Sequence, residues 1–126
     1  GSKVYKAKSP EIGWQNIRLS EAGKKDPLFA AISGPELKVL QWHEDTFDLP
    51  AGAIHLASSS MVPNQAYRYG KNVYGFQFHV EVNRPMLEDW FTKREDLSEI
   101  LKEGDEYGSQ LGKITTRIYG EFFQLK

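Results

Sequence analysis

Up to residue 80, the hydrophobic positions fall in short clusters that turn-forming residues separate. Clusters of this kind favour extended backbone, and four are predicted as β-strands: residues 3–7, 14–19, 37–43 and 54–58. Ser9, Pro10 and Gly13 lie between the first two clusters, which predicts a pair of strands joined by a loop.

Two further apolar clusters follow, and they predict a hairpin. Residues 66–69 and 73–79 are separated by three residues that begin with Gly70, a spacing typical of a tight connection between strands. The segment 73–79 is the most apolar strand candidate in the chain, so we expect it to lie in the centre of a sheet.

The hydrophobic period changes after Asn83, a residue that can cap a helix. Apolar residues then recur every three or four positions, which predicts helices at about 83–91 and 97–102, the latter ending near Gly104. A third helix is expected from about residue 110 to the end, with its apolar stripe packed on a sheet. Strands followed by helices fit either a small α+β domain or one half of a larger α/β sheet.

Composition narrows the function classes. The 126 residues suit one small domain, and 16 basic against 17 acidic residues give a net charge of −1, so neither nucleic acid nor a membrane surface is expected as a partner. No apolar run is long enough to cross a bilayer. The absence of cysteine excludes disulfides, thiolate metal sites and a Cys nucleophile within these residues, and it fits a cytoplasmic location.

The candidate chemistry lies at the end of the most apolar strand, where Glu81 follows His79 by two positions. Side chains at i and i+2 of extended backbone point to the same side, so the Glu81 carboxylate can accept a hydrogen bond from one ring nitrogen of His79. The other nitrogen then remains available as a base, which is the base-and-orienter half of a nucleophile triad. His43, Glu44 and Asp45 match no standard metal spacing, so no metal or other cofactor is expected.

The segment Gly75–Glu81 resembles the G-x-Q-F-H-P-E signature of the class I glutamine amidotransferases, including GMP synthase-like members. Further resemblances follow in the family's order and extend the similarity over about residues 3–91: Glu11–Trp14, Trp42–Asp45, Leu56–Ser59 and Asn64–Gly70. Val80 stands where the family usually has proline, which leaves the turn between His79 and Glu81 possible but less fixed.

The resemblance implies the C-terminal portion of an α/β, flavodoxin-like fold and a glutaminase with a Cys-His-Glu triad. It places His79 and Glu81 in the triad. It also places His43, Gln65 and Ala66 near bound glutamine, although a backbone-bonded role for His43 and a turn role for the other two are equally open. The family's cysteine elbow precedes the segment that begins at Lys3, so residues 1–126 are expected to be a C-terminal part that is inactive alone.

Partners follow from the same resemblance. Glutamine would be the substrate, ammonia would pass to a synthase, and a broken sheet edge would favour a homodimer or a strand-exchanged assembly. Two alternatives stay open: a cysteine-free binding module on the same scaffold, and a relative of the γ-glutamyl peptidases.

Overall fold

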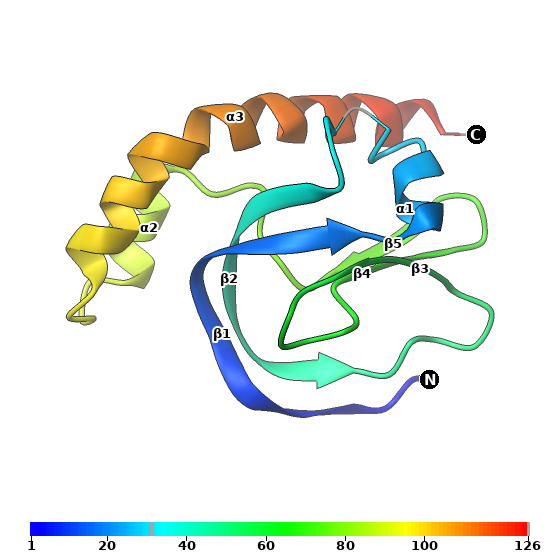
Figure 1. Cartoon of the computed structure of the whole chain (residues 1–126), viewed down its shortest axis with the longest axis horizontal. Coiled ribbons are helices and arrows are strands. Elements are labelled where there is room, and N and C mark those ends of the chain that lie inside the picture. Colours follow the sequence, from blue (N-terminus) through cyan, green and yellow to red (C-terminus); the bar gives the residue numbers. More distant parts are fainter. Residues whose placement is uncertain (31, 126) are drawn as a thin grey trace.

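The computed structural model describes residues 1–30 and 32–125. It has a five-stranded antiparallel sheet and three helices, in the order β1 (Val4–Leu19), α1 (Glu21–Lys25), β2 (Glu36–Phe47), β3 (Ile54–Ser58), β4 (Ala66–Tyr69), β5 (Val73–Phe76), α2 (Arg84–Trp90) and α3 (Leu97–Gln124). The spatial order of the strands is β2-β1-β3-β4-β5. Figure 1 shows that β1 and β2 curl around the shorter strands and that α3 lies across one side of the sheet.

The first strand differs from the sequence prediction, which placed a loop between residues 7 and 14. β1 is continuous through Pro10 and Gly13, and its pairing with β2 shifts register between Lys6 and Glu11. Proline has no N–H to donate, so a bulge is where a strand tolerates it. Gly13 has a φ of 97°, which glycine adopts without strain. The turn-forming residues therefore bend the strand instead of ending it.

The last strand also differs from the prediction. β5 ends at Phe76, not at residue 79, and it lies at an edge of the sheet among the described residues, not in its centre. Its apolar residues serve aromatic packing: the ring of Phe76 lies 5.6 Å from that of Phe29 and stacks on Phe78 at 5.2 Å. Beyond the strand, the backbone N–H of His79 donates to the carbonyl of Leu40 in β2 at 2.9 Å.

The helices follow the apolar period with one correction. The predicted helix after Asn83 is confirmed as α2, and the Asn83 side chain caps it by accepting from the N–H of Met86 at 3.1 Å. The predicted break near Gly104 is wrong, because α3 runs unbroken for 28 residues. A Cβ at Gly104 would lie 2.9 Å from Cδ1 of Leu87, so this glycine permits close packing of α2 on α3.

The predicted core role of the α3 stripe is confirmed. Its buried members are Ile100, Leu111, Ile114 and Ile118, which join the core formed by the strands. Trp14 of β1 reaches the start of the helix, where its indole N–H donates to the carbonyl of Ile100 at 3.1 Å.

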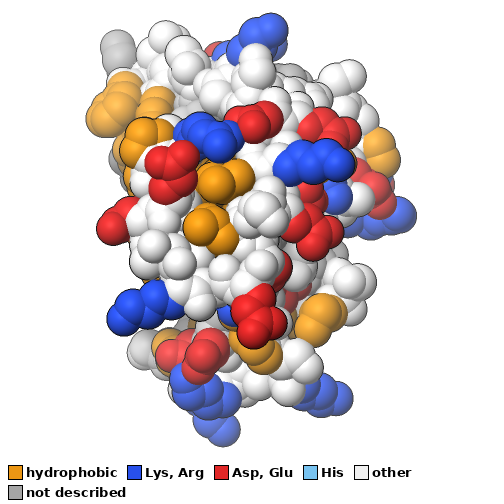
Figure 2. Space-filling view, turned by 90° about the vertical axis from the view of Figure 1, so that its left-hand side faces the viewer, with side chains coloured by type: hydrophobic (Ala, Val, Ile, Leu, Met, Phe, Trp, Pro, Cys, Tyr) orange, Lys and Arg blue, Asp and Glu red, His pale blue; other side chains and the backbone are white. Residues whose placement is uncertain are grey.

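One face of the molecule carries charges of both signs. Figure 2, which looks onto the side where β1 and β2 curve, shows acidic and basic side chains interspersed with small apolar patches. No helix in residues 1–30 and 32–125 has the length and apolar character to cross a membrane.

Candidate active site

His79 and Glu81 form the contact that their spacing predicts. His79 Nδ1 lies 2.7 Å from Glu81 Oε1, and both side chains are partly exposed. Burial opposes the charge on Glu81, but the hydrogen bond from His79 and two from nearby backbone outweigh it and hold the pKa of Glu81 below its usual value. An ionised carboxylate accepts only, so Nδ1 is the protonated nitrogen and Nε2 carries the lone pair in the neutral ring.

Val80 contributes to this geometry through its backbone. Its N–H donates to Glu81 Oε2 at 2.9 Å, and its carbonyl accepts from the Thr115 hydroxyl of α3 at 2.7 Å. A proline has no N–H, so the first of these bonds depends on the residue that departs from the family signature. The turn that the sequence predicted to be less fixed is therefore held through both the N–H and the carbonyl of Val80.

Two tryptophans cover one side of the histidine. The ring of Trp90, at the end of α2, meets that of His79 edge-on at 5.1 Å. Trp42 of β2 packs behind it, with its ring 5.1 Å from that of Trp90. His79 is therefore fixed by three neighbours: a carboxylate at Nδ1, an aromatic ring at its side and the backbone of Leu40 at its N–H.

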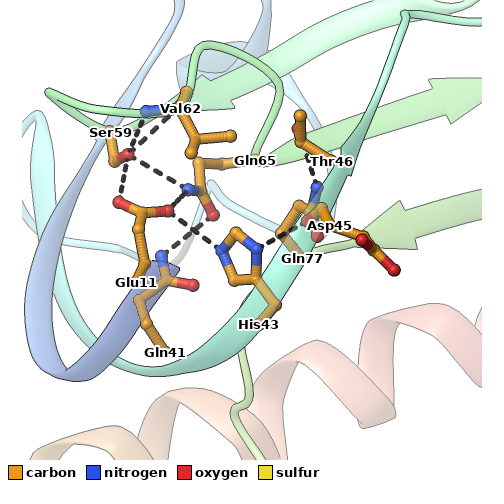
Figure 3. A network of polar contacts seen from close by, with 9 residues as sticks. All are labelled: Glu11, Gln41, His43, Asp45, Thr46, Ser59, Val62, Gln65 and Gln77. Carbon is orange, nitrogen blue, oxygen red and sulfur yellow. Dashed lines mark hydrogen bonds and ion pairs between the residues drawn. The ribbon is translucent and has the colours of Figure 1, made fainter. Parts of the chain in front are cut away.

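A second polar group surrounds Glu11, whose side chain is fully buried (Figure 3). Glu11 Oε2 accepts from the Ser59 hydroxyl at 2.6 Å. Glu11 Oε1 accepts from the side-chain amide of Gln65 and lies 3.0 Å from His43 Nε2. Gln65 Oε1 in turn accepts from the amide of Gln41 at 2.9 Å. These contacts bring together side chains from β1, β2 and the segment that joins β3 to β4.

The pKa values of the ionisable pair shift in opposite directions. Burial opposes charge on Glu11, but hydrogen bonds from His43, Ser59 and Gln65 outweigh it and lower the pKa of this carboxyl. Burial likewise disfavours charge on His43, but its bonds to Glu11 and to the Asp45 carbonyl prevail and raise its pKa. Both groups are therefore stabilised in their charged forms.

The backbone connects this network to His79. The Gln65 carbonyl accepts from the N–H of Gln77 at 2.8 Å, two residues before His79. Gln41 directly follows Leu40, whose carbonyl holds the N–H of His79. The network thus lies beside both backbone segments that position the histidine.

The structure therefore unites the predicted residues in two neighbouring groups. His79 and Glu81 form one, and His43 and Gln65 belong to the other, where their side chains bond to Glu11. Ala66 is buried at the start of β4 and pairs with Phe76. Its contact with glutamine stays a prediction, as do those of His43 and Gln65.

Sequence reasoning missed four members of these groups: Glu11, Gln41, Ser59 and Thr115. Glu11 and Ser59 do belong to segments that carry the family resemblance, which is the signal in the sequence that could have drawn attention to them. Nothing in the sequence singles out Thr115, which lies 35 residues beyond its partner.

The fold and the two groups define an α/β domain with a histidine-carboxylate pair at a sheet edge. Residues 1–90 match the family model for class-I glutamine amidotransferase, and the chain belongs to this family.

Three curated relatives illustrate its place in the family. The glutamine amidotransferase-like protein YfeJ of Salmonella typhimurium is 43% identical over 81 residues, covering 64% of this chain and 34% of that protein. Gamma-glutamyl peptidase 4 of Arabidopsis thaliana is 35% identical over 92 residues, covering 71% and 37%. The GMP synthase of Christiangramia forsetii is 30% identical over 99 residues, covering 74% and 19%.

The fold is similar to that of solved family members. A glutamine amidotransferase from Thermotoga maritima superposes with a TM-score of 0.87 at 28% identity, over 98% of this chain and 56% of that one. The chain spans about a third or less of the length of these curated relatives and just over half of this solved neighbour.

Proposed function

We propose that this chain supplies the histidine-glutamate part of a domain that hydrolyses the side-chain amide of glutamine. The supporting observation is the 2.7 Å contact between His79 Nδ1 and Glu81 Oε1, which leaves Nε2 as the nitrogen that can accept a proton. These residues contain no cysteine, so the nucleophilic thiol of the proposed triad lies in a segment outside them.

In the proposed reaction, His79 Nε2 accepts the thiol proton, and the thiolate sulfur attacks the amide carbon of glutamine. The C–N bond breaks as His79 returns the proton to the leaving nitrogen, which departs as ammonia and leaves a γ-glutamyl thioester. Water, deprotonated by His79, then attacks the thioester carbon; the C–S bond breaks, glutamate is released, and the sulfur recovers the proton from His79. Glu81 keeps the ring in one tautomer throughout and stabilises the transient imidazolium.

Glutamine binding is proposed for His43 and for the segment formed by Gln65 and Ala66. Gln65 and Ala66 lie beside the segment that leads to His79, because they pair with Gln77 and Phe76, and Glu11 links the side chain of His43 to that of Gln65. The buried Glu11 network holds the side chains of His43 and Gln65, so backbone groups of the segment are the ones left to meet the substrate.

The fate of ammonia is part of the same proposal. We propose that the ammonia passes to the active site of a synthase on a partner domain or subunit, where a second substrate accepts it. Because β5 is an edge strand of the sheet in the described residues, a homodimer or a strand-exchanged assembly of the isolated chain is an expected outcome at high concentration. A cytoplasmic location fits because a free thiolate is preserved in a reducing compartment.

A second candidate activity is γ-glutamyl peptide hydrolysis, which the 35% identity to Gamma-glutamyl peptidase 4 favours. The bond cleaved is again a γ-glutamyl amide, but the leaving group is an amino acid instead of ammonia. Comparing glutamine with a γ-glutamyl dipeptide as substrate separates the two activities.

The test uses two proteins: the 126-residue chain, and a protein in which it is joined to its cysteine-bearing segment. We expect the chain alone to release no ammonia from glutamine above background and the complete protein to do so. His79→Ala should abolish turnover in the complete protein. His55→Ala is the matched control, because the His55 ring bonds only to the Pro63 carbonyl among the described residues. Turnover by the chain alone, or by the His79→Ala variant, contradicts the proposal.

A further inference from the structure

The protonation state of His43 follows from its two neighbours. Nδ1 lies 2.8 Å from the carbonyl oxygen of Asp45, which can only accept, so Nδ1 carries a proton. Nε2 lies 3.0 Å from Glu11 Oε1, and this carboxylate already accepts from Ser59 and Gln65. Donors at both oxygens favour the ionised form of this carboxyl, and in that form Nε2 donates to it as well. In this arrangement His43 is an imidazolium.

The resulting ion pair is almost completely withdrawn from solvent. The side chain of Glu11 is 0% exposed and that of His43 is 11% exposed. The pair satisfies its charges with neutral donors and acceptors on all sides, which is the condition under which a buried pair is tolerated. The other charged groups near His43 are Glu44 and Asp45, on its own strand, and Lys6 of β1, which pairs with them at 3.0 and 3.2 Å on the exposed side.

We propose that Glu11 and His43 form a lasting buried ion pair whose role is to position the Gln65–Ala66 segment beside His79. The two are positioning residues, because neither reaches the reacting atoms. This inference rests on the glutamine-binding role proposed above for the segment, and it adds the device that holds the segment in place.

The positioning follows from the direction of each hydrogen bond. The negative charge of Glu11 requires Gln65 to present its NH2 group, which turns Gln65 Oε1 towards Gln41. The Gln65 backbone is fixed at the same time, because its N–H donates to the Ala57 carbonyl at 3.0 Å and its carbonyl accepts from Gln77. A neutral group at position 11 would allow the Gln65 amide to flip and would release this orientation.

The first arm of the test needs no catalysis. In ¹⁵N nuclear magnetic resonance spectra of the 126-residue chain at neutral pH, both ring nitrogens of His43 should have the shifts of protonated imidazole. Glu11→Gln should remove one of these protons and displace the backbone amide signals of Gln65 and Ala66. Glu44→Gln is the matched control: this neighbour of His43 is exposed and pairs with Lys6. A neutral His43 in the unmodified chain, or unmoved amide signals, would overturn the inference.

The second arm measures kinetics in the cysteine-bearing protein. Glu11→Gln should raise KM for glutamine about tenfold or more and change kcat less than threefold, because the His79–Glu81 pair is untouched. Glu44→Gln should leave both constants unchanged. An unchanged KM in an active Glu11→Gln protein contradicts the inference. An inactive unmodified protein would instead refute the proposed function, and the resonance arm would still decide the ion pair.

Discussion

Replacing Glu81 by glutamine in the cysteine-bearing protein tests how the carboxylate controls His79. Glu81 accepts two hydrogen bonds, from His79 Nδ1 at 2.7 Å and from the Val80 N–H at 2.9 Å. Glutamine has one acceptor oxygen and an NH2 group in place of the second, so it can satisfy only one of these donors. The Val80 N–H is fixed in the backbone, whereas the imidazole can change its tautomer.

The favoured arrangement of the variant therefore places the amide oxygen on Val80 and the NH2 group on His79 Nδ1. Nδ1 must then accept a hydrogen bond, so the ring proton moves to Nε2. Nε2 is the nitrogen that has to accept the thiol proton in the proposed reaction. Loss of the charge alone would weaken the bond by about 1–1.5 kcal/mol, or roughly tenfold in rate. A reversed tautomer adds to this, and in serine-protease triads the corresponding change costs about 10⁴-fold in kcat. We expect a fall in kcat of about 10²- to 10⁴-fold.

The assay is steady-state release of glutamate and ammonia, with Glu88→Gln as the control. Glu88 lies on α2, is half exposed and pairs with Arg84 at 3.1 Å, so its loss should leave kcat unchanged. The decisive variant is Val80→Pro, which removes the competing N–H. In the Val80→Pro background, Glu81→Gln should lower kcat by a factor at least ten times smaller than in the unmodified background, because the amide oxygen is then free to face His79. The tautomer argument is refuted if Glu81→Gln lowers kcat by the same factor in both backgrounds, or if Glu81→Gln alone lowers kcat less than tenfold.

Two further predictions concern stability. Gly23→Ala should destabilise the fold by about 2–3 kcal/mol in urea unfolding, because the added Cβ would lie 2.1 Å from the backbone oxygen of Leu56. Gly108→Ala on α3 meets no atom within 4 Å and should instead stabilise by about 0.5–1 kcal/mol, so an equal loss in both variants would contradict the packing argument. The second prediction concerns pH. The lowered pKa of Glu11 contributes stability that is present above its unfolded value of 4.5 and is lost as pH falls through the folded value. The raised pKa of His43 contributes stability that is present below its unfolded value of 6.5 and is lost as pH rises through the folded value. The urea midpoint should therefore be highest between these two pH values, and Glu11→Gln should flatten both limbs; a variant with an unchanged profile would disprove the coupling.

Local rules were sufficient for one part of the site. The two-residue spacing of His79 and Glu81 sets the relative direction of their side chains through backbone geometry alone. The contact could therefore be predicted from the short segment Gly75–Glu81. The apolar stripe of α3 is equally local, because a helical period repeats within a few turns. Gly104 misled the prediction because its role is decided by Leu87 of another helix.

The Glu11 network was not readable for the opposite reason. The bonds that Glu11 makes join it to residues 32 to 54 positions away, and no local pattern indicates which distant polar residues will be buried together. Burial of a carboxylate depends on partners that only the folded sheet assembles. The bend of β1 that places Glu11 there also depends on pairing with β2 through a register shift. The family resemblance included the segments that contain Glu11, Ser59 and Gln65, but it did not indicate that their side chains bond to one another.

The unbroken course of α3 has a consequence for how the domain responds to force. At 28 residues the helix is about 42 Å long, and it touches Trp14 at its beginning, the Val80 carbonyl at its middle and the ring of Tyr74 near its end. Because these three contacts lie on one continuous helix, a displacement of α3 at one contact also strains the other two. A partner that displaces the aromatic end of this helix would therefore also strain the Thr115–Val80 bond, which lies between His79 and Glu81.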